Sequence, residues 1–155
     1  MDEIIQVASE EEVAIAARLF REYEKWLGLD LCFQGFEAEV AGLPGKYAPP
    51  AGRLLLSMAD GVPAGCGALR DLGADICEIK RLFVRMGFRG GGRGRALIER
   101  LMKEARDSGY RIIRLDTHPP KMGKAVALYR SYGFYETQPY YDNPYDDVLF
   151  MEAAL

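Results

Sequence analysis

The run Arg89-Gly90-Gly91-Gly92-Arg93-Gly94 lies between a predicted strand, residues 76–84, and a helix predicted from about residue 92 to residue 107. Glycine lacks a Cβ, so consecutive amides can turn inward and approach an anion closely. The helix N-terminus adds unpaired N–H groups and the positive end of a dipole. This run therefore predicts a cradle for a diphosphate. Additional positive charge would come from Arg89, Arg93 and Arg95.

Other phosphate-binding and loop motifs fit this run less well. The dinucleotide pattern GxGxxG would require glycine at Arg95 or Leu97, and no Gly-Lys-Ser/Thr follows for a P-loop. RGG-type RNA contacts are usually repeated and disordered, whereas this single copy lies between two patterned elements, so we expect no nucleic-acid partner. A purely structural turn needs fewer than three consecutive glycines.

The rest of the chain alternates strand and helix patterns. The dipeptide Asp60-Gly61 favours a type I′ hairpin, and Ser9 with Glu12 forms a capping box at a helix start. Strands are predicted over residues 4–7, 53–59, 62–70, 76–84, 111–117 and 148–153, and helices over 9–28, 36–41, 92–107 and 122–132. Residues 43–52 are predicted as a loop because they are rich in proline and glycine.

This order predicts an α+β fold with helices around a mostly antiparallel sheet. The strand 76–84, the basic helix and the strand 111–117 form a βαβ unit, so these two strands should be parallel. A length of 155 residues fits a single domain over residues 1–155.

The charge is unevenly distributed along the chain. The net charge is −3 and apolar residues make up 49%, an ordinary globular balance that gives no reason to expect adhesion to nucleic acid or to a membrane. Residues 80–106 hold nine basic and two acidic side chains, a net charge of +7, which leaves −10 for the remainder. The basic segment indicates a local anion site, and the acidic remainder weakly favours a cationic substrate.

Cysteine usage and the N-terminus indicate a cytoplasmic protein. Cys32, Cys66 and Cys77 are an odd number without CxxC spacing, and His118 is the only histidine, so neither a disulfide framework nor a zinc site is expected. The acidic N-terminus lacks the features of a signal peptide. No apolar stretch approaches the roughly 20 residues that cross a bilayer.

Two motifs together resemble the GNAT N-acetyltransferase superfamily. Arg89-x-x-Gly92-x-Gly94 is similar to that family's acetyl-coenzyme A loop, with Leu82-Phe83-Val84 before it and Ala96-Leu97 after it. The segment from Ala125 to Phe134 is similar to the family's A-x-x-L-Y-x-x-x-G-F motif. The resemblance is sharp over residues 76–134, and the element order extends it over nearly the whole chain.

The resemblance implies α/β/α layers and a mixed, mainly antiparallel sheet of about six or seven strands, whose central parallel pair splays apart around acetyl-coenzyme A. It implies acetyl transfer to a primary amine of a small molecule, peptide or protein, by direct attack in a ternary complex and without a metal. Backbone amides near Phe83, Val84 and Arg85 would hold the thioester carbonyl. The cofactor residues implied are Leu82, Phe83, Val84, Arg89, Gly90, Gly91, Gly92, Arg93, Gly94, Arg95, Ala125 and Tyr129.

The resemblance also suggests the catalytic residues. Glu78 is the preferred general base, because some family members have a glutamate six positions before Val84; a structural ion pair with Lys80 or Arg81 is the alternative. Tyr129, which matches the family's tyrosine, is the preferred general acid, and an aromatic core residue is the alternative. The cysteines have no histidine placed beside them by the sequence, so a covalent acetyl-enzyme is disfavoured.

The substrate side is less well defined. Asp116 and His118 fall at the end of a predicted strand, where a polar side chain could contact the amine or move its proton. Tyr140, Tyr141, Asn143 and Tyr145 crowd a loop that suits either a small polar ligand or a dimer contact, in a monomer or a homodimer. Residues 33–47 could form the opposite wall. The rival function is a non-catalytic module that binds or senses acyl-coenzyme A.

Overall fold

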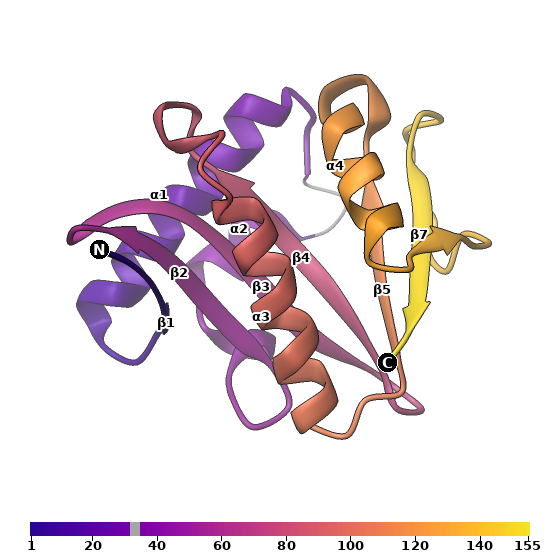
Figure 1. Cartoon of the computed structure of the whole chain (residues 1–155), viewed down its shortest axis with the longest axis horizontal. Coiled ribbons are helices and arrows are strands. Elements are labelled where there is room, and N and C mark those ends of the chain that lie inside the picture. The colour runs from indigo at the N-terminus through magenta and orange to yellow at the C-terminus, as the bar shows by residue number, and fades with distance from the viewer. Residues whose placement is uncertain (32–34) are drawn as a thin grey trace.

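The computed structural model describes residues 1–31 and 35–155, and within these lies a mixed seven-stranded sheet in the order β1-β2-β3-β4-β5-β7-β6 (Figure 1). The strands are β1 (Asp2–Gln6), β2 (Arg53–Ala59), β3 (Val62–Gly73), β4 (Ile76–Val84), β5 (Ile112–Thr117), β6 (Tyr135–Glu136) and β7 (Leu149–Ala154). The helices are α1 (Glu10–Leu27), α2 (Phe36–Ala41), α3 (Arg93–Asp107) and α4 (Pro119–Ser131), with 3₁₀ turns η2 (Gly45–Tyr47) and η3 (Met86–Phe88). The predicted α+β class is confirmed.

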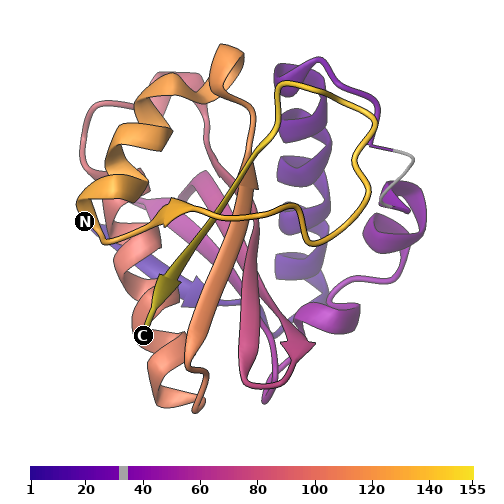
Figure 2. The same cartoon turned by 90° about the vertical axis from the view of Figure 1, so that its right-hand side faces the viewer.

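Helices cover both faces of the sheet, with α1 and α2 on one side and α3 and α4 on the other (Figure 2). The run Leu54-Leu55-Leu56 in β2 explains why both faces are covered, because successive side chains of a strand point to opposite faces. Leu54 and Leu56 join a buried cluster with Phe20 of α1, whereas Leu55 joins a second cluster with Leu97 of α3. No helix in the described residues is long and apolar enough to span a membrane.

The parallel pair at the centre of the sheet is short. β4 and β5 pair in parallel only at residues 76–78 and 112–114, and the neighbouring strand pairs are antiparallel. The predicted βαβ unit is therefore confirmed, and beyond Glu78 the edge of β4 that faces β5 has no strand partner in the described part of the chain. This divergence opens the sheet at the point where the glycine-rich run begins.

Several local predictions are confirmed at the level of backbone angles. Asp60 and Gly61 have φ values of +50° and +80°, as a type I′ turn requires. Ser9 accepts a hydrogen bond from the backbone N–H of Glu12, whose carboxylate accepts one from the N–H of Ser9, which completes the capping box.

The last helix and the last strands differ from the prediction. α4 begins at Pro119 and not at Met122, because His118 is its N-cap and proline fits the first helical turn, where an N–H has no intrahelical partner. The helix is kinked at the predicted start, because Met122 has non-helical angles of φ −125° and ψ 32°. The short strand β6 and the two 3₁₀ turns lack the length that a periodic sequence pattern needs.

Candidate functional site

β4 carries a bulge at Arg81, three residues beyond the last residue that pairs with β5. Ala68 of β3 pairs with Lys80 and Cys66 pairs with Phe83, so two residues of β4 oppose one residue of β3. Arg81 itself has φ = +57°, a left-handed conformation that is rare for a residue with a side chain. Because a bulge bends its strand, this position accounts for the divergence of β4 from β5.

The Arg81 side chain holds the bulge from the side of α2. Its Nε and Nη2 donate to the Glu39 carboxylate at 2.8 and 3.0 Å, and its guanidinium lies 5.1 Å from the ring centroid of Phe36. Both charged side chains are buried. Burial opposes the charge on Arg81, but the hydrogen bonds and the attraction of Glu39 outweigh it and raise the pKa of Arg81 above its ordinary value. The ion pair therefore stays intact at neutral pH.

The glycine-rich run has the backbone conformation of an anion cradle. Gly90 and Gly92 have φ values of +86° and +82°, which residues with a Cβ rarely adopt. Gly92 is the N-cap of α3, and no side chain caps this helix end. The first N–H groups of α3 therefore have no side-chain acceptor among the described residues, and they form the positive end of the helix dipole. This donor set fits the diphosphate of a coenzyme.

A groove of about 180 Å³ leads from this cradle into the gap between β4 and α4. Its lining residues are Trp26, Leu82, Phe83, Val84, Arg89, Lys121, Met122 and Ala125. Six of these eight residues are apolar, and Arg89 and Lys121 add positive charge. Such a groove along a strand edge suits an extended pantetheine arm, because the strand edge supplies peptide groups. The structure thus brings together four of the predicted cofactor residues from the gap and Arg89 from the loop.

The three predicted loop arginines differ in their surroundings. Arg89 donates from Nε to the carbonyl of Val84 at 2.8 Å and lies 4.6 Å from the ring centroid of Trp26, on the groove wall. Arg93 is bound within the protein, because its Nη atoms donate to the Phe88 carbonyl and to Asp2. Arg95 is exposed and donates to the Tyr132 hydroxyl at 3.2 Å. We therefore expect Arg89 and Arg95 to contact a phosphate more readily than Arg93.

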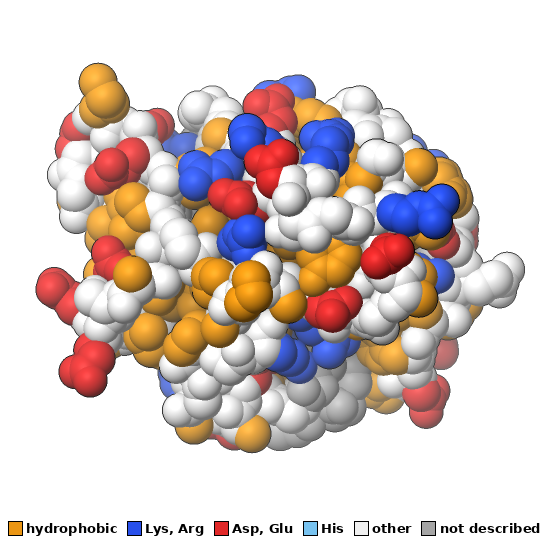
Figure 3. Space-filling model, turned by 90° about the horizontal axis from the view of Figure 1, so that it is seen from below, with side chains coloured by type: hydrophobic (Ala, Val, Ile, Leu, Met, Phe, Trp, Pro, Cys, Tyr) orange, Lys and Arg blue, Asp and Glu red, His pale blue; other side chains and the backbone are white. Residues whose placement is uncertain are grey.

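Most of the basic segment 80–106 is neutralised by acidic partners. The ion pairs are Lys80 with Asp116, Arg81 with Glu39, Arg85 with Glu22, Arg93 with Asp2, Arg100 with Glu104 and Lys103 with Asp107. Figure 3 views the end of the molecule away from the glycine-rich run (compare Figure 1), and there too basic and acidic side chains are interspersed. The net charge of the segment thus overstates its attraction for anions, and the cradle depends mainly on backbone amides.

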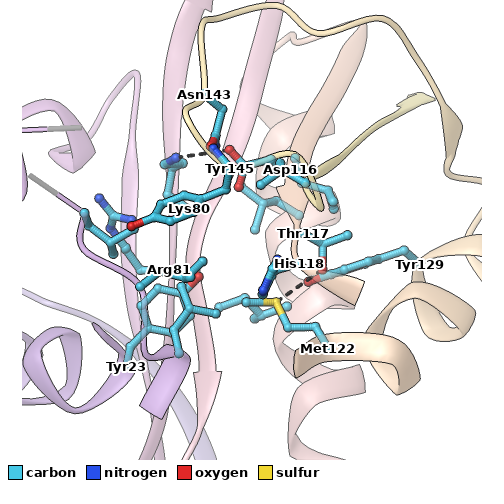
Figure 4. A pocket seen from close by; sticks show the side chains of 17 residues that line it. Tyr23, Lys80, Arg81, Asp116, Thr117, His118, Met122, Tyr129, Asn143 and Tyr145 are labelled. Atoms are coloured by element: carbon cyan, nitrogen blue, oxygen red, sulfur yellow. Dashed lines mark hydrogen bonds and ion pairs between the residues drawn. The ribbon is translucent and has the colours of Figure 1, made fainter. Parts of the chain in front are cut away.

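A separate cavity of about 40 Å³ lies where α1, β4, β5 and α4 meet (Figure 4). It holds space for about three water molecules. Its polar lining residues are Tyr23, Lys80, Arg81, Asp116, Thr117, His118, Tyr129, Asn143 and Tyr145. Leu82 and Met122 line both this cavity and the groove, so the two spaces adjoin.

Tyr129 lines the cavity from α4, and its side chain is buried. Its ring lies 5.7 Å from that of Phe134, so packing and access to the cavity are combined in one side chain. Burial, with smaller contributions from Tyr23 and Asp116, raises the pKa of the Tyr129 hydroxyl. The hydroxyl is therefore fully protonated at neutral pH, as a proton donor must be.

Glu78 is fully buried and does not line the cavity. One carboxylate oxygen accepts from Arg70 Nε at 2.7 Å and the other accepts from the Tyr140 hydroxyl at 2.5 Å. The main ion-pair partner is thus Arg70 rather than Lys80 or Arg81, since Lys80 Nζ is 4.0 Å away. With both oxygens engaged, Glu78 has no direct path to an amine in the cavity unless Tyr140 moves.

The predicted residues on β5 and in the C-terminal loop form a connected network. The Tyr141 hydroxyl donates to the Asp116 carboxylate, and Asn143 Nδ2 donates to that hydroxyl at 2.8 Å. Tyr145 accepts from the backbone N–H of Asp30 at 2.9 Å, which ties the loop to the end of α1 across the cavity. This loop therefore forms a wall of the cavity, and Tyr140 and Tyr141 support it from behind.

His118 lines the cavity, and its Nδ1 atom is buried without a hydrogen-bond partner in residues 1–31 and 35–155. Cys66 and Cys77 are buried elsewhere, and burial raises the pKa of the Cys77 thiol to about 12. Such a thiol is a weak nucleophile at neutral pH, because almost none of it is thiolate. Cys32 and Phe33 lie outside the described residues, as does part of the predicted wall 33–47.

Sequence reasoning did not assign Trp26, Met122 or Lys80 to the site. Trp26 belongs to the apolar stripe of α1, which predicts only a core position. Lys80 could have been found from strand periodicity, because it shares a face of β4 with Glu78 before the bulge at Arg81. No local signal marks Met122, since its place depends on how α4 packs across the gap.

Solved structures with the same fold place the groove in context. A GNAT family acetyltransferase from Staphylococcus aureus superposes with a TM-score of 0.82 at 18% identity, with 99% of each chain covered. The PaiA N-acetyltransferase of Thermoplasma acidophilum, solved in complex with coenzyme A, gives a TM-score of 0.76 at 19% identity, covering 100% of this chain and 99% of that one. The architecture is therefore that of a GNAT fold.

Sequence comparison identifies the family itself. Residues 13–134 match the Acetyltransferase (GNAT) family. An uncharacterized N-acetyltransferase of Schizosaccharomyces pombe is 38% identical over 139 residues, which cover 88% of this chain and 85% of the relative. The chain belongs to the GNAT acetyltransferase family and is an acyltransferase, which confirms the resemblance found in the sequence.

Proposed function

We propose that the protein transfers an acetyl group from acetyl-coenzyme A to a primary amine by direct attack in a ternary complex. The observation that carries the proposal is the junction at Leu82 and Met122, where the groove suited to a pantetheine arm meets a polar cavity. Acetyl-coenzyme A would supply an activated acetyl group as its thioester. The groove fits the coenzyme because its cradle offers unpaired amides and its walls are mainly apolar.

The protein would bind and orient the two substrates with different elements. The first turn of α3 and the amides of the glycine-rich run would hold the diphosphate, with Arg89 beside it. The peptide groups of β4 beyond its bulge would hold the thioester carbonyl, whose oxygen gains negative charge as the amine attacks. The cavity residues would orient the amine on the opposite side.

Tyr129 is the proposed general acid. In the transfer, a C–N bond forms between the amine and the acetyl carbon, and the C–S bond of the thioester breaks. The Tyr129 hydroxyl would protonate the departing sulfur, and its raised pKa keeps this proton available at neutral pH.

For the proton that the amine loses, the geometry favours His118 over Glu78. His118 lines the cavity and its Nδ1 atom is unpartnered in the described residues, whereas both Glu78 oxygens are engaged. We propose that His118, directly or through water, takes this proton and that Glu78 positions Arg70 and Tyr140 behind the cavity. A His118→Gln variant should then lose activity most near neutral pH, where most of the amine is protonated and needs a base, and least near about pH 10, where the free amine is abundant.

The test is release of coenzyme A thiol from acetyl-coenzyme A in the presence of a panel of amines, with the acetylated product identified by mass spectrometry. Thiol release that depends on the amine supports the proposal. A module that only binds or senses acyl-coenzyme A would bind the coenzyme without amine-dependent release. That result would overturn the catalytic assignment.

A further inference from the structure

Lys80 is a buried cation for which the proposed mechanism has no use. Its side chain is only 7% exposed, yet it lines the cavity. Its Nζ atom lies 3.7 Å from the Asp116 carboxylate and 4.0 Å from that of Glu78, and 5.7 Å from the ring centroid of Tyr141. These contacts balance its charge, but both oxygens lie beyond normal hydrogen-bond distance.

The ammonium group therefore has three N–H donors and no hydrogen-bond acceptor among the described residues. Because the side chain is only 7% exposed and lines the cavity, these donors face the cavity, and an unmet charged donor there costs free energy. An anionic oxygen in the cavity would satisfy these donors. Arg81 is less suited to this role, because two of its N–H donors and its charge are already engaged by the Glu39 carboxylate.

The two ends of the cavity are lined by different residues. In Figure 4, Lys80 and Asn143 lie toward one end, whereas His118, Met122 and Tyr129 lie toward the other. The second end is the one beside the groove, because Met122 lines both spaces. A ligand anchored at Lys80 would thus extend toward the residues proposed for proton transfer.

We propose that the acceptor is a small amino carboxylate, that is, a molecule with a carboxylate next to a primary amine, as in a compact amino acid. Lys80 would bind the carboxylate, and the amine would point toward His118 and the groove. A volume of about 40 Å³ with apolar walls at Leu27, Leu29 and Val148 restricts the acceptor to a compact one. The inference rests on the proposed N-acetyltransferase function.

This acceptor differs from the cationic one that the acidic remainder of the chain favours. Surface acidity acts over the whole molecule and is screened by salt, whereas Lys80 acts at the site. A polyamine in the cavity would bring a second cation close to the buried Lys80 ammonium, and like charges repel most strongly where water is excluded.

The experiment uses matched pairs of acceptors that differ only in the carboxylate: small amino acids, their carboxamides and their decarboxylated amines. Release of coenzyme A thiol gives kcat and KM for each. Calorimetric titration of the same compounds into the protein saturated with coenzyme A gives binding without turnover. We expect each amino acid to have a KM and a Kd roughly 10- to 100-fold lower than its carboxamide.

Variants of Lys80 make the test specific. Lys80→Met should remove this preference by raising KM for the amino acids while leaving the Kd of acetyl-coenzyme A unchanged, and Lys80→Arg should restore part of it. Lys103→Met is the matched control, because Lys103 is an exposed lysine on α3 that pairs with Asp107 one helical turn away. The unchanged Kd of acetyl-coenzyme A also shows that each variant is folded.

Equal use of amino acids and of amines without a carboxylate would overturn the inference. The inference would also be overturned if the protein bound coenzyme A but neither bound nor acetylated any small acceptor. That outcome would leave a peptide or protein acceptor open, and the proposed function would stand. Failure to bind acetyl-coenzyme A would overturn the proposed function and this inference together.

Discussion

The groove and the cavity adjoin at Leu82 and Met122, but the first presents mainly backbone groups and the second mainly side chains. The groove side uses backbone: glycines at positive φ and, within residues 1–31 and 35–155, a helix end without a side-chain cap and a strand edge without a partner strand. The cavity side uses buried side chains that bind one another, as Glu78 does with Arg70 and Asp116 with Tyr141. Backbone recognises what is common to all coenzyme A thioesters, whereas side chains can be exchanged to choose an acceptor.

The largest expected effect is at Tyr129, the proposed general acid, which lines the cavity. Tyr129→Phe removes only a hydroxyl, and if that hydroxyl protonates the departing thiolate, kcat should fall by about 100-fold or more. The Kd of acetyl-coenzyme A should stay the same, because the ring still packs on Phe134. Stopped-flow or steady-state thiol release measures kcat, and calorimetry measures the Kd of acetyl-coenzyme A. A kcat close to that of the unchanged protein would remove Tyr129 from the chemistry.

Next in size is the buried network on the acceptor side. Glu78→Gln leaves Arg70 without its ionic partner in a site where the carboxylate is fully buried, so we expect a loss of about 2 kcal/mol in the free energy of unfolding. Urea denaturation measures this loss. Glu37→Gln is the matched control, because it breaks the exposed ion pair with Arg21 and should have no measurable effect.

The same Glu78→Gln variant also separates the two candidate bases. If Glu78 only positions its neighbours, the folded variant should keep the pH profile of kcat. A shift of the acidic limb of that profile would instead favour Glu78 as the base and would count against His118.

A smaller effect is expected from the backbone of the groove side. Gly92→Ala places a Cβ on a residue with φ = +82°, which costs roughly 1–2 kcal/mol. We expect the Kd of coenzyme A to rise about tenfold while KM for the acceptor changes little. Gly87→Ala serves as the control, because Gly87 lies in the same segment without a positive φ and with open space around it. Equal losses in both variants would argue against a preorganised cradle.

The last prediction is that kcat does not change as the pH rises above neutrality. The pKa of Tyr129 is raised by burial above its ordinary value of 10.0, so the acid keeps its proton at every pH below that value. The kcat should therefore show no alkaline decline between pH 7 and about pH 10. A decline with a midpoint near pH 8 would show that a different group donates the proton.

The groove side could be predicted from sequence, and the cavity side only partly. Glycine run, strand and helix are consecutive in the chain, so local pattern and the handedness of a βαβ unit predicted the cradle and the parallel pair. The groove residues Leu82, Phe83, Val84 and Ala125 came from the family resemblance, and Trp26 and Met122 were not predicted. The pairs Arg70 with Glu78, Arg81 with Glu39 and Lys80 with Asp116 join separate elements, and a single sequence does not state which side chains meet. For the same reason the basic segment predicted more free charge than the structure has.

Hydrogen exchange with and without coenzyme A tests the division between the two regions most directly. The account predicts that coenzyme A slows amide exchange at residues 82–84 and 89–96, with little change in the loop 140–145. Protection of that loop or of β4 before its bulge, with residues 89–96 unaffected, would contradict it.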